Sequence, residues 1–296
     1  MAEGKVLVGT AGWSYEDWKG NVYPSKVPRG FDPLAYMAGF FDCLEINSTF
    51  YRPPSPQVAR SWARRVSRNQ EFRFTVKLWQ GFTHKREAIS GEDVRGFLRG
   101  VEPLREEGAL GCLLIQFPWS FKNVAENRSY LAQLLRQFQE LPRAVELRHA
   151  SWDREDSYRF LADEGAGFVN IDQPLFHRSM APSSRATSPV GYVRLHGRNW
   201  GDWFREGAGR DARYDYLYSE EELEPWLENI RRVAQSAEVT FVITNNHYRG
   251  QAACNALQIK ATLHGRPIPV PPSLASSFPQ LEPLTEARLH LFPQGP

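Results

Sequence analysis

The sequence predicts one α/β domain, a (β/α)8 barrel of the TIM type that ends in an extended, proline-rich tail. Short runs of β-branched and apolar residues alternate with helical patterns, which is typical of a parallel sheet covered by helices. There are eight such runs, and eight parallel strands close more naturally into a barrel than into an open sheet. The 296 residues match the size of one barrel, and no linker or internal repeat divides them. We expect a barrel domain over residues 1–264 and a tail over residues 265–296.

The expected elements follow one another in strict alternation. The strands are expected at residues 5–10, 42–47, 72–77, 110–116, 144–148, 167–172, 191–196 and 239–244. The helical patterns are found at residues 33–39, 56–67, 92–106, 127–140, 156–165, 219–237 and 251–263. The connection 173–189 is rich in Ser and Pro and has no clear helical pattern, so one unit is expected to be irregular. The eight prolines after residue 264 favour an extended surface segment over a ninth unit.

Composition excludes several classes of protein. The chain is 42% hydrophobic, which excludes a disordered chain, and 36 basic against 34 acidic residues leave a net charge of +2. That balance excludes a polybasic, histone-like binder but permits a local basic patch. The expected second helix carries Arg60, Arg64, Arg65 and Arg68, a run that is usually a solvated face.

The apolar runs, the first ten residues and the cysteines of the sequence favour a reducing compartment. No run approaches the ~18 to 20 apolar residues of a membrane span. The first ten residues lack the apolar core and cleavage site of a secretory signal, so we expect a cytoplasmic protein without a membrane partner. Cys43, Cys112 and Cys254 are scattered without CxxC spacing, which fits reduced thiols and no structural zinc.

Polar residues recur at every second position near the ends of the expected strands. Side chains two residues apart share a strand face, and the apolar phase must meet the helices, so the polar phase is expected inside the barrel. The in-phase pairs are Glu45 with Asn47, Thr75 with Lys77, Glu146 with Arg148, Asn170 with Asp172, and Arg194 with His196, and Gln116 stands at the end of a sixth strand. All lie at C-terminal strand ends, where barrel enzymes form their sites. An inward polar pair on one strand fits a packing network equally well, but five strands in register favour a functional cavity.

The loops after these strands add aromatic side chains. They include Trp13, Tyr15 and Trp18 in the first loop, Phe50 and Tyr51 in the second, Trp79, Phe82 and His84 in the third, and Trp119, Trp152, Trp200 and Trp203 later. Aromatic rings around a polar floor suit stacking on sugar rings or nucleobases. The alternative is that they cap the barrel as hydrophobic plugs.

Seven segments resemble a known family. GTAGWSYEDWKGNVYP, LEINSTFYRPPSP, VKLWQGFTH, LLIQFPWSF, VELRHASW, YVRLHGRNW and TNNHYRGQAACNAL are similar to successive signatures of the YecE-like family, domain of unknown function 72. The resemblance spans about residues 5 to 264 and leaves out the tail. The resemblance implies a TIM barrel of unassigned activity. The family's barrel is similar to that of the sugar-isomerase and endonuclease IV group, and DNA binding has been suggested from this similarity. The family's motif positions fall on Trp13, Glu45, Asn47, Phe50, Tyr51, Lys77, Gln116, Glu146, Arg148, Arg194, His196, Asn245 and Asn246.

Three chemistries are weighed against these residues. Glu45, Glu146, Asp172 and His196 resemble metal ligands, but three carboxylates face three cations, so no metal and no cofactor are expected. Glycoside hydrolysis could use Glu45 and Glu146, yet the strand ends that usually carry its carboxylates hold Gln116 and His196. A Schiff base at Lys77 needs a depressed pKa, whereas carboxylates nearby are expected to favour its charged form.

An anionic ligand fits these residues best. We expect the barrel mouth to bind a polar, ring-bearing anion such as a sugar phosphate or nucleotide, with Lys77, Arg148 and Arg194 as cations. Glu146 or Glu45 would be the acid or base, and His196 would be a proton carrier or a hydrogen-bonding group. The site would be lined by Trp13, Tyr15, Asn47, Phe50, Tyr51, Gln116, Asp172, Asn245 and Asn246. Asn245 and Asn246 precede the final helix and would either contact a phosphate or cap that helix. A nucleic-acid-binding protein with endonuclease IV-like chemistry and a non-enzymatic binding barrel remain alternatives, and no obligate protein partner is evident.

Overall fold

The structure, a computed structural model, describes residues 4–86, 89–201 and 212–285. Eight parallel strands close into one barrel in the order β1 to β8, with β1 also paired to β8. The strands are β1 Lys5–Ala11, β2 Cys43–Ile46, β3 Arg73–Lys77, β4 Leu110–Gln116, β5 Arg143–Glu146, β6 Gly167–Asp172, β7 Val190–Leu195 and β8 Val239–Thr244. The expected (β/α)8 barrel is therefore confirmed, with strand limits that differ by one or two residues.

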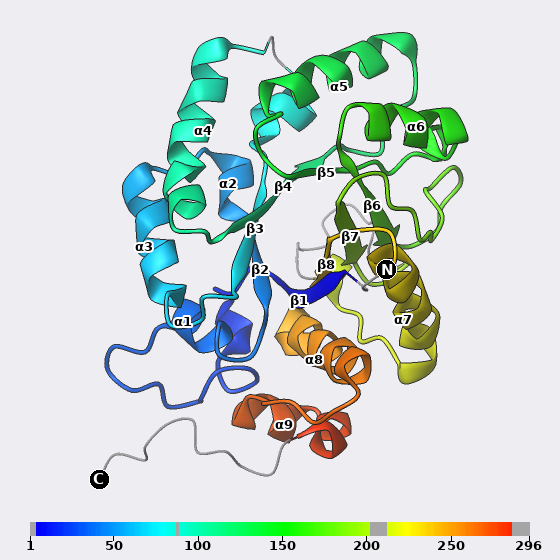
Figure 1. Cartoon of the computed structure of the whole chain (residues 1–296). Coiled ribbons are helices and arrows are strands. Elements are labelled where there is room, and N and C mark those ends of the chain that lie inside the picture. The colour runs from blue at the N-terminus through cyan, green and yellow to red at the C-terminus, as the bar shows by residue number, and fades with distance from the viewer. Residues whose placement is uncertain (1–3, 87–88, 202–211, 286–296) are drawn as a thin grey trace.

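Helices surround the barrel on its outside (Figure 1). They are α1 Pro33–Met37, α2 Ser48–Tyr51, α3 Pro56–Val66, α4 Gly91–Glu106, α5 Ala125–Gln137, α6 Glu155–Asp163, α7 Glu220–Ala234, α8 Gln251–His264 and α9 Pro272–Ser277. Side-chain caps start several of them: Ser55 and Ser90 each accept a backbone N–H, and Ser219 forms a capping box with Glu222. Between β6 and β7 the chain has no helix, as the Ser- and Pro-rich sequence predicts. No helix in the described residues is long and apolar enough to cross a membrane.

The first part of the tail is folded, which differs from the extended segment expected. After α8 the chain forms α9 and a 3-10 helix at Pro279–Leu284, which contacts α8; both lie at the red end of the chain in Figure 1. Leu274 and Leu281 are fully buried there, so apolar residues between the prolines anchor the tail to the barrel. Proline is favourable at the first helical position, which is where Pro272 stands. Residues 286–296 lie outside the described residues.

The barrel interior beneath the strand ends is closed by aromatic and hydroxyl side chains. Tyr192 on β7 donates its hydroxyl to Glu45 Oε2 at 3.0 Å and lies 3.0 Å from the Thr75 hydroxyl on β3. Its ring packs near Phe241, with 6.0 Å between centroids. The polar groups at the C-terminal strand ends therefore rest on a filled core.

Candidate functional site

A buried arginine links two glutamates across the mouth of the barrel. Arg194 on β7 donates from Nε and Nη2 to the carboxylate of Glu45 on β2, at 3.0 and 2.6 Å. Its Nη1 donates to Glu146 Oε2 on β5 at 3.0 Å and to Gln116 Oε1 on β4 at 3.1 Å. The arginine side chain is 2% exposed and both glutamates are fully buried. We expected Arg194 to meet a ligand anion, but its donors are occupied by internal acceptors.

Arg148 lies nearer to solvent and covers Glu146. Its Nε donates to Glu146 Oε1 at 2.8 Å, and its side chain is 17% exposed. Within the described residues, Nη1 of Arg148 has no hydrogen-bond partner. Burial raises the pKa of Glu146, but Arg148 and Arg194 outweigh it and hold that pKa well below its ordinary 4.5. Glu146 is therefore a carboxylate at neutral pH and is poorly suited to the acid role that the sequence suggested.

His196 follows β7 and completes this cluster. Its Nδ1 lies 3.0 Å from the side-chain amide nitrogen of Asn245, and its Nε2 lies 3.2 Å from Glu146 Oε1. Nε2 also lies 3.2 Å from Arg148 Nη2 and 3.3 Å from Arg194 Nη1, so two guanidinium groups and one carboxylate surround this nitrogen. Burial, aided by Arg194 and Arg148, lowers the pKa of His196 to about 3 despite the carboxylate. The imidazole is therefore neutral at pH 7 and acts as a hydrogen-bonding group.

Lys77 stands at the end of β3 with a different environment. Its Nζ lies 4.3 Å from the centroid of the Phe50 ring on α2, and within the described residues it has no hydrogen bond or ion pair. Burial and then Arg194 lower the pKa of Lys77 to about 7, against the opposing effect of Glu45 and Glu146. Glu45 and Glu146 favour the charged form of Lys77, as expected, but burial and Arg194 outweigh them.

His84 belongs beside this lysine, although the sequence placed it only among the loop aromatics. It lies in a π-helical turn at Gly81–Lys85, and its ring centroid is 4.9 Å from that of Phe50. Burial, and after it the nearby Lys77, lower the pKa of His84 to about 4. Its position in the third loop, seven residues after Lys77, was the available signal.

The other expected aromatic residues and Asn47 differ in their exposure and packing, and Trp203 lies outside the described residues. Tyr51 is 60% exposed on α2, and Asn47 is half-buried just before that helix. Trp13 packs against Trp62 on α3, with ring centroids 6.2 Å apart, and against Phe74. Tyr15 stacks on His247 at 4.4 Å. The contacts of Trp13 are those of a plug between the first loop and the helical shell.

Asp172 faces away from the site, contrary to expectation. Residues paired across a sheet share a face, and the partner of the inward-facing Tyr192 is Val169, so Val169 and Ile171 point inward. Asp172 points outward and binds Arg198 at 2.8 and 3.1 Å and the Tyr218 hydroxyl at 2.5 Å.

Asn170 shares the outward direction of Asp172. It holds the backbone of Arg185 in the loop that follows β6. The expected phase fails here because a polar loop, not an apolar helix, covers this face.

The loop after β8 also differs from the phosphate cradle that the sequence suggested. Asn246 points toward α8, where its amide nitrogen donates to Asn255 Oδ1 at 2.9 Å and to the carbonyl of Tyr216 at 2.7 Å. It does not cap α8, whose N-cap is Gly250. The backbone N–H of Arg249 donates to Asp17 at 2.5 Å, so a carboxylate of the first loop already occupies it. Of the two asparagines, only Asn245 reaches the cluster, through His196.

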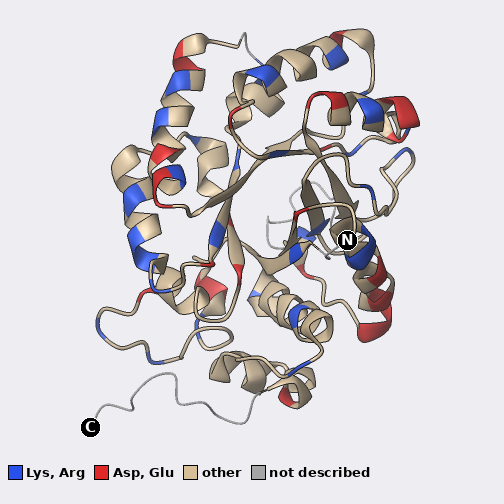
Figure 2. Ribbon diagram, viewed as in Figure 1, with Lys and Arg blue, Asp and Glu red and all other residues tan. Residues whose placement is uncertain are grey.

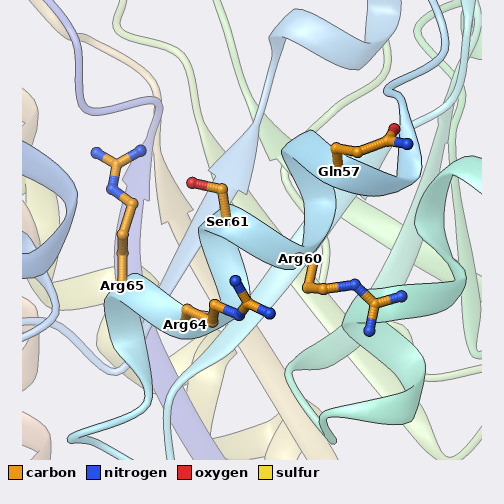
Figure 3. A pocket seen from close by; sticks show the side chains of 5 residues that line it. All are labelled: Gln57, Arg60, Ser61, Arg64 and Arg65. Atoms are coloured by element: carbon orange, nitrogen blue, oxygen red, sulfur yellow. The ribbon is translucent and has the colours of Figure 1, made fainter.

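The arginine run on α3 forms a separate surface feature. A hollow there is lined by Gln57, Arg60, Ser61, Arg64 and Arg65 (Figure 3). Arg65 is paired with Asp32 in a bidentate salt bridge. Figure 2 shows basic residues along α3 and both signs of charge along the neighbouring α4. This surface lies on the outside of the barrel, apart from the residues around Arg194.

Metal-binding residues are not gathered in the described part of the chain. Within residues 4–86, 89–201 and 212–285, no three His, Cys, Asp or Glu side chains lie together as around an ion. The two site carboxylates are instead paired with arginines.

Comparison with known proteins places the chain in a family. The family described as Protein of unknown function DUF72 matches residues 7–277, from β1 through α9. The chain belongs to the DUF72 family. The match extends beyond the resemblance seen in the sequence and takes in the start of the tail. The description names no activity.

Relatives of this DUF72 protein are found among bacterial proteins. It is 31% identical over 268 residues to UPF0759 protein YunF of Bacillus subtilis (strain 168), covering 86% of this chain and 93% of YunF. It is 26% identical over 189 residues to UPF0759 protein YecE of Escherichia coli (strain K12), covering 61% of this chain and 64% of YecE.

Solved structures show the same fold. A DUF72 family protein from Thermotoga maritima MSB8 is 40% identical with a TM-score of 0.77, covering 88% of this chain and 99% of that one. Another from Enterococcus faecalis V583 is 27% identical with a TM-score of 0.76, covering 88% and 95%. An O-GlcNAc hydrolase from Thermobaculum terrenum is 11% identical with a TM-score of 0.51, covering 95% of this chain and 63% of the hydrolase. That last similarity shows the fold alone.

Proposed function

We propose that this DUF72 protein is an enzyme that performs acid–base chemistry on a small, polar, anionic ligand at the C-terminal mouth of its barrel. The observation that carries the proposal is the environment of Lys77, which brings its pKa to about 7. A proton-transfer group works best when its pKa lies near the working pH, because both protonation states are then populated. Lys77 thus replaces Glu146 and His196 as the group that exchanges protons.

The charges of the site support an anionic ligand. Glu45 and Glu146 offset Arg194 and Arg148, so a protonated Lys77 leaves one positive charge without an internal partner. In the part of the chain that the structure describes, Arg148 Nη1 has no partner, and a guanidinium pairs well with phosphate or carboxylate. An anion bound between Arg148 and Lys77 would favour the protonated lysine and raise its pKa.

The surrounding rings suit a ligand with a ring or a sugar framework. Phe50 and His84 lie on one side of Lys77, and the exposed Tyr51 extends from the same helix as Phe50. Sugar rings and nucleobases pack on such side chains. A sugar phosphate or a nucleotide combines this framework with the required charge.

Glycoside hydrolysis fits the geometry less well. It needs two carboxyl groups with the scissile bond between them. In this site the guanidinium of Arg194 lies between Glu45 and Glu146 and binds both. The fold shared with a hydrolase does not alter that argument, because one fold hosts many activities.

The test compares a phosphorylated ligand with its neutral counterpart. We expect calorimetric titration at about pH 7 to show that ribose 5-phosphate binds at least about ten-fold more tightly than ribose, a difference of about 1.4 kcal/mol. Arg148→Gln should weaken binding of ribose 5-phosphate and leave that of ribose unchanged. The matched control, Arg64→Gln, removes one exposed arginine on the outer face of α3 and should change neither affinity.

Other outcomes separate the alternatives. Equal affinity for ribose and ribose 5-phosphate would contradict the proposal. Tight binding of single-stranded DNA that weakens steeply with salt would favour a nucleic-acid-binding protein. Binding without conversion of any tested sugar phosphate or nucleotide, followed by NMR, would favour a non-enzymatic binding barrel.

A further inference from the structure

We propose that Lys77 is a nucleophile that forms an imine with the carbonyl carbon of a small aldehyde or ketone bearing an anionic group. The inference rests on the proposed function and adds to it a substrate class and a covalent step. Its basis is the geometry around Nζ, which differs from that of the other buried lysine of the described chain.

Within the described residues, the Lys77 amine lacks a strong acceptor. One side of Nζ faces the Phe50 ring at 4.3 Å, and its half-buried side chain ends at the mouth of the barrel. Lys260 provides a contrast: its Nζ donates to Asp42 Oδ1 at 2.8 Å and to the carbonyl of Phe40 at 2.9 Å. An ammonium held in that way stays charged, whereas Lys77 has neither contact.

The cations of the site also favour the neutral amine. Arg194 and Arg148 both lower the pKa of Lys77, and burial acts in the same direction. A lysine nucleophile is activated by an apolar wall or by a cationic neighbour, and Lys77 has both. At about pH 7 roughly half of the molecules then carry a free electron pair on Nζ.

The reaction balances without a further reactant. The electron pair of Nζ attacks the carbonyl carbon, a C–N bond forms, and the carbonyl π electrons move to oxygen. The two amine protons pass to that oxygen, the C–O bond breaks, and one water molecule leaves the imine. Arg148, whose Nη1 has no partner among the described residues, would bind the anionic group of the substrate.

The experiment traps the imine by reduction. The protein is incubated with dihydroxyacetone phosphate and sodium borohydride, then analysed by intact mass and peptide mapping. We expect one adduct per chain, on Lys77, with a mass gain equal to the ketone less one oxygen atom. Lys77→Arg should abolish the adduct, and the matched control Lys26→Arg, an exposed loop lysine, should retain it.

A second measurement uses the wild-type chain alone, so that misfolding of a variant cannot mislead. The trapping yield at Lys77 should rise with a midpoint near pH 7, whereas exposed lysines react only toward their ordinary pKa of about 10.4. Adducts spread equally over exposed lysines, or none on Lys77 between about pH 6 and 9, would overturn the inference.

The two proposals fail in different ways. Ribose 5-phosphate that binds normally while no carbonyl compound is trapped would overturn the imine step and leave the acid–base proposal standing. Trapping of neutral glycolaldehyde on Lys77, as efficient as that of dihydroxyacetone phosphate and unaffected by Arg148→Gln, would support the nucleophile and contradict the anionic ligand.

Discussion

Arg194 and Glu45 form a bidentate salt bridge across the inside of the barrel, with nitrogen–oxygen distances of 3.0 and 2.6 Å. They belong to β7 and β2, which are not neighbours in the sheet. The pair therefore ties opposite walls together, and both side chains are removed from water. Breaking such a pair from one side leaves a buried charge without compensation.

Glu45→Gln is expected to destabilise the protein strongly. The change is nearly isosteric, but it leaves Arg194 with Glu146 as its remaining carboxylate partner. Loss of one partner of a buried pair costs about 3–5 kcal/mol, measured as the free energy of unfolding in urea. Glu71→Gln is the matched control, because Glu71 pairs with Lys5 on the surface and its loss should not be measurable. Similar effects for both variants would show that the Arg194 pair is not the structural tie inferred here.

His196 should make the protein sensitive to acid. Its pKa is about 3 in the folded chain and about 6.5 when exposed, so between these values only the unfolded chain binds a proton there. Stability contributed by the neutral imidazole is complete above about pH 6.5 and is lost as the pH falls toward 3. His196→Gln should flatten the dependence of the unfolding free energy on pH across this window. An unchanged slope would contradict the low pKa.

Lys77→Met should raise stability while removing the proposed chemistry. Folding lowers the pKa of Lys77 from 10.5 to about 7. Below about pH 7 the folded chain therefore carries a buried ammonium, which costs free energy, and the free energy of unfolding rises as the pH increases from about 7 to 10.5. Replacing it by an apolar side chain of similar length is expected to increase the unfolding free energy at pH 7 by on the order of 1–2 kcal/mol. A decrease, measured by urea unfolding, would mean that the ammonium stabilises the fold.

Asp172→Asn tests the outward direction of β6. Asp172 accepts hydrogen bonds from Arg198 and Tyr218 and is nearly fully buried, so its loss should lower the unfolding free energy by about 3 kcal/mol. Binding of ribose 5-phosphate should be unchanged, because none of the contacts of Asp172 involves Lys77 or Arg148. Weaker binding by a variant that still folds would place Asp172 at the site after all.

The alternation of strands and helices could be read from the sequence because it depends on local patterns. Runs such as that at 110–116 are apolar enough to be buried on both faces, and β4 has the same limits, Leu110–Gln116. The period-two rule also brought Glu45, Glu146, Arg194 and His196 together, since residues two apart on a strand share a face.

The rule failed on β6 because it assumes that an apolar helix covers the outer face of every strand. Asn170 and Asp172 face outward, where the polar loop after β6 and Arg198 satisfy them. Which segment covers a strand depends on the path of the chain through space, and a single strand's pattern does not contain that information. The folding of the tail around Leu274 and Leu281 was missed for the same reason, because proline content predicts local stiffness but not what an apolar neighbour will contact.

The residue pattern alone predicts a (β/α)8 barrel with paired charges at the ends of its strands. Which of these charges pair with each other, and that Lys77 has no ion pair among the described residues, depends on the three-dimensional arrangement of the strands. Arg194 pairs with both glutamates and lies near Lys77, and burial together with this guanidinium outweighs the carboxylates that favour the charged lysine. The pKa of a buried group depends on the distances to every charge around it, and those distances are set when strands far apart in the chain close into a barrel.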